Sequence, residues 1–325
     1  MTAGPAITFI IPVRNDEARL AQCLASIGRN GHAGACEILV IDNGSIDGSV
    51  AVARRAGATA IELPHATVAE MRNTGAKAAK GTFLAFVDAD HLLDSGWVTA
   101  ALEILDDEGI TAAGAPYATP NDANWLQRSY GRLRPELKGS EPVDWLGSGN
   151  LILRAGAFHQ VGGFDTSLET CEDVDLCNRL RLRGFRLIAD ERLRSVHLGD
   201  PATVRAVFFG ELWRGRDNMR VTLRGPLSLR ALPSLLIPIW NLAALASVVL
   251  GLAIWPWAGG LWAVVAVSAL MLTVALRFWR LLPRRAWAAG DLLGAVAVAT
   301  TYEVARAMAL VARATHRTRR EVAKA

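Results

Sequence analysis

Short apolar runs alternate with amphipathic segments over the first 114 residues of the chain. Apolar runs of roughly four to eight residues between polar turns are typical of buried strands, and apolar residues spaced three and four apart are typical of helices. The predicted strands are Ile7–Ile11, Glu37–Ile41, Thr59–Leu63 and Thr82–Val87. The predicted helices between them are Glu17–Ile27, Ile46–Ala56 and Val68–Ala79. This alternation, with short loops, predicts an α/β fold whose mostly parallel sheet has helices on both faces.

A different pattern begins near residue 231, because no charged residue occurs from Ala231 to Leu276. One helical crossing of a bilayer needs about 20 apolar residues, so this run is long enough for two. The segment Trp255–Gly260 contains Pro and Gly and divides the run. We therefore predict a transmembrane hairpin at 231–277, with helices at 232–254 and 259–277. Arginines flank it on both sides while its turn is uncharged, which predicts that both ends are cytoplasmic.

Residues 286–312 form a third apolar stretch, which carries Asp291, Glu303 and Arg306. If this stretch crossed the bilayer, the basic tail at 313–325 would lie outside, against the preference of basic residues for the cytoplasmic side. We expect an interfacial or re-entrant helix, with Glu303 and Arg306 able to pair; a third span is the alternative. The basic juxtamembrane segment at 206–230 suits anionic lipid headgroups.

The composition agrees with a membrane-attached chain. Hydrophobic residues make up 51% of it and the mean hydropathy is +0.24, which is high for a soluble enzyme. The net charge of +4 owes much to the arginines beside the hairpin, and no stripe of basic and aromatic residues indicates nucleic-acid binding. The four cysteines lack CxxC spacing and are expected to be free thiols. Without the features of a signal peptide, the N-terminal domain is expected to face the cytoplasm from the inner membrane.

Polar side chains gather where the predicted strands end. The first strand is followed by Pro12–Glu17, the second by Asp42, and the fourth by Asp88 and Asp90. Ligands of open α/β sheets bind at this carboxyl edge, and divalent cations often bridge carboxylates to substrate phosphates there. The sequence therefore predicts a metal–diphosphate site, with a plain polar loop as the alternative. The lack of GxGxxG and GxxxxGK[ST] argues against a dinucleotide-binding or P-loop enzyme.

Five motifs occur along the chain in a specific order. They are Phe9–Glu17, Val40–Ser49, Arg72–Gly75, Asp88–Asp90, and Gly162–Asp165 with Glu172–Leu176. Over about residues 6–200 the chain resembles a family 2 glycosyltransferase of the GT-A fold. The arginine-rich stretch and hairpin resemble the membrane-attached members that build exopolysaccharides of the succinoglycan type. The resemblance implies a glycosyltransferase domain at 1–205, with a nucleotide-binding half at 1–114 and an acceptor half at 115–205.

The resemblance also implies roles for single residues. The implied nucleotide and donor-binding residues are Pro12, Val13, Glu17, Asp42, Arg72 and Asp88. The implied metal ligands are Asp90 and His197, and the implied catalytic base is Asp173. The acceptor candidates are Trp145, Gly149, Asn150 and Glu172. We expect His91, next to the carboxylate pair, to be a surface residue or a neighbour of the ligands.

Simple chemistry agrees with these roles. A nucleoside diphosphate leaves as an anion, so a divalent cation, Mg²⁺ or Mn²⁺, and Arg72 would stabilise the growing charge. Asp173 precedes a predicted helix at Val174–Leu182, whose dipole would lower the pKa of the carboxyl while burial would raise it. Structural alternatives remain at this stage: a turn role for Asp42, a surface role for Arg72, a helix cap for Asp173 and a packing role for His197.

These observations predict an inverting, metal-dependent transferase. The expected donor is a nucleotide sugar, with UDP favoured, and the expected acceptor is a membrane-associated molecule such as a polyprenyl-diphosphate-linked glycan. One alternative is transfer to a simple lipid or polyprenyl phosphate. The other is a non-catalytic sugar-nucleotide-binding scaffold subunit, against which the intact Asp88, Asp90 and Asp173 argue. The missing QxxRW pattern argues against a processive synthase.

Overall fold

The structure is a computed structural model of the 325-residue chain. It describes residues 5–30, 36–226, 229, 231–253, 259–282 and 288–322. Residues 255–258 of the predicted hairpin turn and 323–325 of the predicted basic tail lie outside these ranges. The chain divides into an N-terminal unit, Met1–Pro120 with Arg134–Gly199, and a C-terminal unit, Asn121–Leu133 with Asp200–Ala325.

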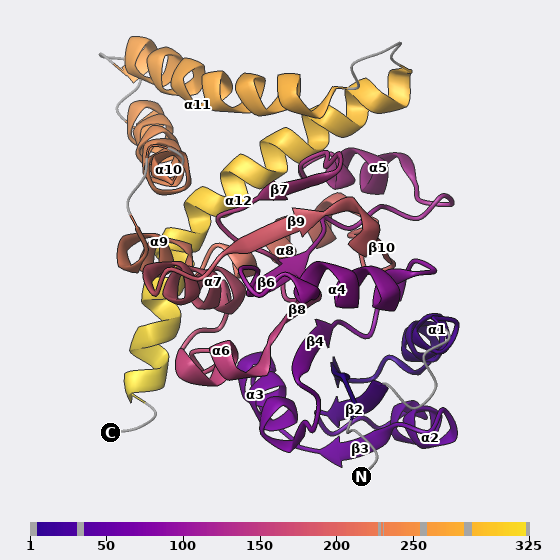
Figure 1. Cartoon of the computed structure of the whole chain (residues 1–325). Helices are drawn as coiled ribbons and strands as arrows, with labels where there is room; N and C mark the ends of the chain where they lie inside the picture. The colour runs from indigo at the N-terminus through magenta and orange to yellow at the C-terminus, as the bar shows by residue number, and fades with distance from the viewer. Residues whose placement is uncertain are drawn as a thin grey trace. The chain divides into compact units, whose positions relative to one another are not determined.

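An eight-stranded mixed sheet forms the centre of the N-terminal unit, in the order β3-β2-β1-β4-β8-β6-β9-β7 (Figure 1). Its strands are β1 (Ile7–Val13), β2 (Cys36–Asp42), β3 (Thr59–Glu62), β4 (Phe83–Val87), β6 (Ala112–Gly114), β7 (Ser140–Pro142), β8 (Asn150–Arg154) and β9 (Leu187–Asp190). β1 pairs in parallel with β2 and with β4, and β2 pairs in parallel with β3. β8 runs antiparallel to both β4 and β6. A separate antiparallel pair joins β5 (His91–Leu93) to β10 (Ser195–His197).

Helices cover both faces of this sheet, as the strand–helix alternation predicts. They are α1 (Glu17–Gly28), α2 (Ser49–Arg55), α3 (Val68–Ala78), α4 (Trp97–Asp106), α6 (Ala155–Gln160) and α7 (Glu172–Leu182), with a 3-10 turn, η1, at Glu191–Leu193. Alternate residues of β1 enter different hydrophobic clusters: Phe9 packs in the cluster that contains α1 and α4 residues, and Ile10 in the one that contains α3 and α7 residues. The predicted α/β fold is confirmed.

Two helices begin at different residues from those predicted. α2 begins at Ser49 rather than Ile46, because hydrogen bonds to carboxylates hold the preceding turn: Ser45 N donates to Asp42 Oδ2, and Ser49 N to Asp47 Oδ1. α7 begins at Glu172 rather than Val174, and Cys171 before it has a φ of 59°. Asp173 therefore lies inside the first turn of α7 rather than in the loop before it.

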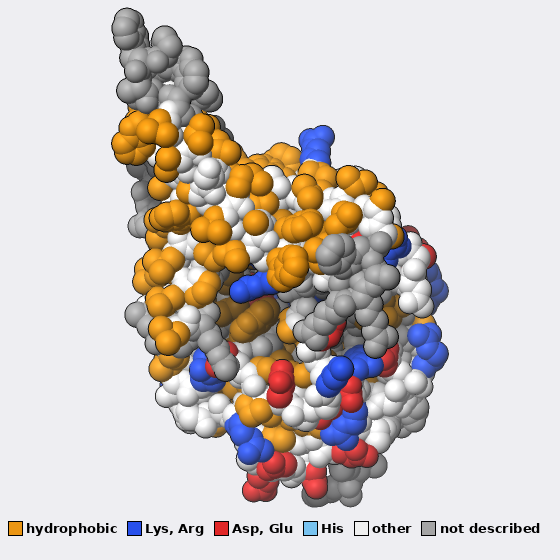
Figure 2. Space-filling view, turned by 90° about the horizontal axis from the view of Figure 1, so that it is seen from above, with side chains coloured by type: hydrophobic (Ala, Val, Ile, Leu, Met, Phe, Trp, Pro, Cys, Tyr) orange, Lys and Arg blue, Asp and Glu red, His pale blue; other side chains and the backbone are white. Residues whose placement is uncertain are grey.

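The C-terminal unit is helical in the part that the structure describes. Its helices are α5 (Trp125–Gly131), α8 (Val204–Arg214), α9 (Asn218–Arg224), α10 (Leu232–Ala253), α11 (Gly259–Leu281) and α12 (Ala289–Val322). Three segments are long and apolar enough to cross a membrane: Leu232–Gly251, Val264–Leu281 and Ala289–Ala312. The third falls in the stretch for which the sequence predicts an interfacial helix or, alternatively, a span. Large hydrophobic side chains of α10 and α11 are exposed, and Figure 2 shows hydrophobic side chains gathered over much of one face.

Buried ion pairs link the helices of this unit. Glu303 of α12 accepts from Asn241 at 2.7 Å and pairs with Arg277. Arg306 Nε of α12 lies 2.9 Å from Oε2 of Glu211 in α8. The structure therefore differs from the predicted pairing of Glu303 with Arg306, because each of them finds a partner on another helix.

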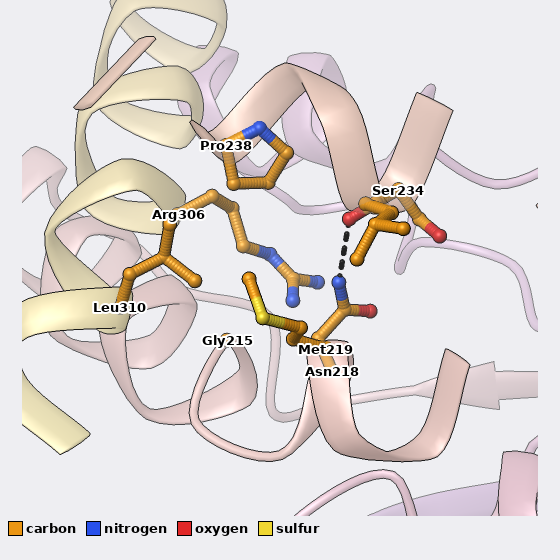
Figure 3. A pocket seen from close by; sticks show the side chains of 8 residues that line it. Gly215, Asn218, Met219, Ser234, Pro238, Arg306 and Leu310 are labelled. Atoms are coloured by element: carbon orange, nitrogen blue, oxygen red, sulfur yellow. Dashed lines mark hydrogen bonds between the residues drawn. The ribbon is translucent and has the colours of Figure 1, made fainter. Parts of the chain in front are cut away.

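A small cavity of about 10 Å³ lies where α12 meets the start of α10 and the α8–α9 loop (Figure 3). Gly215, Asn218, Met219, Ser234, Leu235, Pro238, Arg306 and Leu310 line it. Beside it the Asn218 side chain donates to the Ser234 carbonyl at 2.8 Å. A cavity of this size holds about one water molecule, so the helices are closely packed at this point.

Candidate active site

The loops after β1 and β2 are joined by hydrogen bonds. Gly48 N donates to Glu17 Oε2 at 3.1 Å, and Glu17 N donates to Asp47 Oδ2 at 3.0 Å. Asp42 is buried at the end of β2, where its register partner is Val13 of β1. Its Oδ2 accepts from Ser45 N, but its Oδ1 has no hydrogen-bond partner among the described residues. A buried carboxylate oxygen without a partner is costly, so this atom is available for a ligand donor.

Arg72 of α3 connects the loop after β4 to the start of α7. Its Nη2 lies 2.7 Å from Asp88 Oδ1, and its Nη1 lies 2.6 Å from Glu172 Oε1. The side chain is only 3% exposed and lies over the Phe164 ring. Because one planar guanidinium holds both carboxylates, Asp88 and the start of α7 are fixed relative to each other.

Asp173 is half-buried in the first turn of α7, and its Oδ1 accepts from Val174 N at 2.8 Å. Burial, followed by repulsion from Glu172, raises the pKa of Asp173 to about 7. The hydrogen bond from Val174 N and the charge of Arg72 lower this pKa, but burial outweighs them. A carboxyl with a pKa near neutrality is suited to accept a proton during catalysis.

Three possible metal ligands converge where β5 pairs with β10. The nearest ligand atoms of Asp90, His91 and His197 all lie within 4.8 Å of one another. His91 and His197 are direct partners in the β5–β10 register, and Arg19 of α1 approaches Asp90 at 3.5 Å. Burial alone would raise the pKa of Asp90, but the hydrogen bond and charge of His197 lower it to about 2. Burial lowers the pKa of His91 to about 4, which favours the neutral imidazole that binds metals.

Two glycines leave space beside these ligands. A Cβ atom at Gly199 would lie 2.0 Å from Asp90 Oδ2 and 3.1 Å from His197 Nε2. A Cβ atom at Gly149 would lie 2.8 Å from Asp88 Oδ2 and 2.9 Å from His91 Nε2. Any larger residue would fill this space, so the residues present fit a divalent cation with carboxylate and imidazole ligands.

The four acceptor candidates occupy different environments. Trp145 is 53% exposed, whereas Glu172 is buried against Arg72. Gly149 lies next to Asp88. Asn150 is directed into the sheet: its amide donates to the Ala115 and Leu193 carbonyls and accepts from the Trp97 indole. The structure thus gives Asn150, which is only 1% exposed, a role in joining β8 to α4, to η1 and to the residue after β6.

Three residues near the site are absent from the sequence-based set: His91, Arg19 and Tyr117. The Tyr117 ring packs 4.8 Å from the His91 ring and 5.0 Å from the His197 ring, and the Arg134 guanidinium lies over it. His91 is 1% exposed, so of the two expected positions, at the surface or next to the ligands, the structure shows the second. In the sequence, only its position directly after Asp90 indicates that His91 belongs to the site, because its pairing with His197 depends on tertiary structure.

Sequence comparisons match residues 8–160 to glycosyl transferase family 2. A pre-mycofactocin glycosyltransferase of Mycobacterium tuberculosis is 27% identical over 201 residues, covering 57% of this chain and 42% of that protein. Glycosyltransferase AglE of Haloferax volcanii is 26% identical over 241 residues, covering 70% of this chain and 77% of that protein. The chain therefore spans less than half of the first relative.

Solved structures show the same architecture. Mannosyltransferase PcManGT from Pyrobaculum calidifontis, in complex with GDP-Man and Mn²⁺, superposes with a TM-score of 0.60 at 18% identity, covering 96% of this chain and 88% of that one. TarS of S. aureus, residues 1–349, gives a TM-score of 0.53 at 14% identity, covering 93% and 90%. At these identities the likeness shows a shared fold.

Proposed function

We propose that this chain, whose residues 8–160 match glycosyl transferase family 2, moves a sugar from a UDP-linked donor to a membrane-held acceptor, with inversion at the anomeric carbon. One observation carries the proposal. Arg72 links a cluster of possible metal ligands around Asp90 to a carboxyl of raised pKa, Asp173: it contacts Asp88 beside the cluster and Glu172 next to Asp173.

The donor's base is assigned to the pocket formed after β1 and β2. Uracil carries one ring N–H donor, and Asp42 Oδ1 is the buried acceptor that lacks a partner among the described residues. Pro12 and Val13 end β1, with Val13 as the register partner of Asp42, and Glu17 joins the two loops through Gly48. TarS of S. aureus has been solved with UDP and PcManGT with GDP-Man, which supports a nucleotide-sugar donor of some kind.

The donor's diphosphate is assigned to the cation site. Asp90 and His197 would hold a divalent ion, and PcManGT was solved with Mn²⁺. When bound, such an ion neutralises negative charge on the leaving diphosphate. Asp88 faces the donor sugar, and its orientation is set by the 2.7 Å contact with Arg72. Arg72 itself is buried between two carboxylates, which favours a positioning role over direct contact with phosphate.

Asp173 is assigned as the base. As the acceptor hydroxyl oxygen bonds to the anomeric carbon, Asp173 takes the hydroxyl proton and the carbon–oxygen bond to the diphosphate breaks. A single displacement of this kind inverts the anomeric centre. The raised pKa of Asp173 matches this task, since the ideal base titrates near the working pH.

The acceptor is proposed to be lipid-linked and to lie at the cytoplasmic face of the inner membrane. The three apolar helices support membrane attachment, and arginines on both sides of α10 and α11 support a cytoplasmic catalytic unit. On α8 the large hydrophobic side chains of Phe209 and Trp213 are exposed. A polyprenyl-diphosphate-linked glycan is the proposed acceptor, and a polyprenyl phosphate the second candidate; attachment raises the local concentration of either.

Nucleotide binding tests this function directly. UDP, GDP, TDP and CDP are titrated by calorimetry into detergent-purified protein with Mn²⁺ or with EDTA. We expect selective binding of UDP that EDTA abolishes. Asp173→Asn should retain UDP binding and lose transfer, which separates an enzyme from a scaffold subunit. Metal-independent binding, or no binding of any nucleotide, would refute the proposed donor site.

A further inference from the structure

We propose that His91 is a third protein ligand of the cation and that the imidazole pair makes the site select first-row transition ions over Mg²⁺. This inference rests on the proposed metal dependence and goes beyond the two ligands that the family resemblance implies. It concerns this chain's own residues, Asp90, His91 and His197.

The first support is the position of His91. It is 1% exposed and directly opposite His197 across the β5–β10 pair, with the two ring centroids 4.9 Å apart. Both rings offer a nitrogen within 4.8 Å of an Asp90 carboxylate oxygen. A buried imidazole next to a second imidazole and a carboxylate has the spacing of a ligand set.

The second support is the orientation of the ring. His91 Nδ1 lies 3.0 Å from Ser195 Oγ, so Nδ1 is engaged and Nε2 is the nitrogen left to coordinate. Metal-binding histidines commonly fix their second nitrogen in this way. Tyr117 packs edge-on against the same ring at 4.8 Å. Gly149 provides the space at Nε2, because a Cβ atom there would lie 2.9 Å from it.

The ligand types then determine the ion. Mg²⁺ prefers oxygen ligands in octahedral geometry, whereas imidazole nitrogens suit transition metals. Affinity of nitrogen-containing sites rises from Mn²⁺ towards Cu²⁺. Two imidazoles and one carboxylate leave coordination positions for diphosphate oxygens. A site with one imidazole would discriminate less between Mn²⁺ and Mg²⁺ than a site with two.

Mn²⁺ binding to the full chain, without nucleotide and then with UDP, tests the inference. Electron paramagnetic resonance measures the Mn²⁺ affinity, and pulsed detection counts the coordinated ¹⁴N nuclei. We expect two imidazole nitrogens in the wild type and one in His91→Gln. Loss of an outer-shell partner costs roughly 10-fold or more in affinity, so His91→Gln should weaken Mn²⁺ binding by at least about that factor. Its preference for Mn²⁺ over Mg²⁺, from competition titrations, should fall in parallel.

Matched variants separate ligation from folding. His159→Gln changes an exposed histidine of α6 and should leave affinity and nitrogen count unchanged. Ser195→Ala keeps the imidazole but removes its Nδ1 partner, and should weaken Mn²⁺ binding while two nitrogens remain. Metal-free melting temperatures show whether each variant is folded.

Two results would overturn the inference. Two coordinated nitrogens and wild-type affinity in His91→Gln would remove His91 from the ligand set while leaving the proposed function intact. A wild type that binds no Mn²⁺, even with UDP, would overturn the inference and the proposed metal dependence together.

Discussion

Replacing Asp173 by Asn is expected to stabilise the protein at pH 8 and to abolish transfer. The pKa of Asp173 is raised from 3.8 to about 7, chiefly by burial. The folded protein therefore holds a proton that the unfolded chain releases, and stability falls as the pH rises from about 4 to about 7. At about 1.4 kcal/mol for each pKa unit, ionising this carboxyl costs on the order of 4 kcal/mol above pH 7. Asn avoids that cost and can still accept from Val174 N.

The assay is thermal unfolding of detergent-purified protein from pH 5 to pH 8. For a protein of this size about 1 kcal/mol corresponds to roughly 2–4 °C, so Asp173→Asn should melt on the order of 10 °C above the wild type at pH 8. The difference should shrink towards pH 5, where Asp173 is protonated in the folded state. Transfer by the wild type should rise through about pH 7 as Asp173 ionises, and the variant should lose roughly 10²–10⁴ of the rate.

Asp175 is the matched control in the same helix. It is buried and pairs with Arg179 at 2.8 Å, so Asp175→Asn should lower the melting temperature rather than raise it. If the melting temperatures of the wild type and Asp173→Asn differed by the same amount at every pH from 5 to 8, the reasoning would be refuted, because Asp173 would then have the ordinary pKa of a carboxyl.

Three further changes test the rest of the site. Gly199→Ala places a Cβ against Asp90 Oδ2 and should cut turnover about 100-fold, since a displacement of a catalytic group by about 1 Å lowers the rate by that factor. Unchanged kinetics would show that neither the cation nor the donor uses the space beside Gly199. Arg72→Ala leaves the buried Glu172 unpaired and should lower the free energy of unfolding by roughly 3–5 kcal/mol, as measured by denaturant unfolding. A loss under about 1 kcal/mol would show that the Arg72–Glu172 ion pair does not hold the two elements together. Asp42→Asn should reduce the preference for UDP over CDP, measured by calorimetry, about tenfold. This factor corresponds to the free energy of one hydrogen bond, here between the uracil N–H and Asp42.

The N-terminal half of the sheet could be predicted because its strands carry strong local patterns. Phe83–Val87 is a continuous apolar run, Ile7–Val13 is apolar except for Thr8, and both end in charged loops. The second half could not be predicted, since β6 has three residues and β8 joins the sheet antiparallel, between β4 and β6. A three-residue strand has no measurable period, and its partner comes from a distant part of the chain.

The candidate site divides in the same way. Asp42, Asp88 and Asp90 follow apolar strands, so their positions at the sheet edge can be derived from the sequence. The contribution of His91 depends on its register with His197, and no local pattern encodes that pairing. Whether burial or the helix dipole controls the pKa of Asp173 is decided by packing around α7, which the sequence alone leaves open.

The route of the chain through Asn121–Leu133 matters for anyone who wishes to make a soluble catalytic fragment. This segment is flanked on both sides by N-terminal-unit sequence, yet Leu126 and Tyr130 of α5 pack with Val298 and Ala299 of α12. A truncation after Gly199 would remove α12 and leave these side chains as a solvent-exposed hydrophobic patch. A fragment intended for crystallisation should therefore also replace residues 121–133 with a short polar linker.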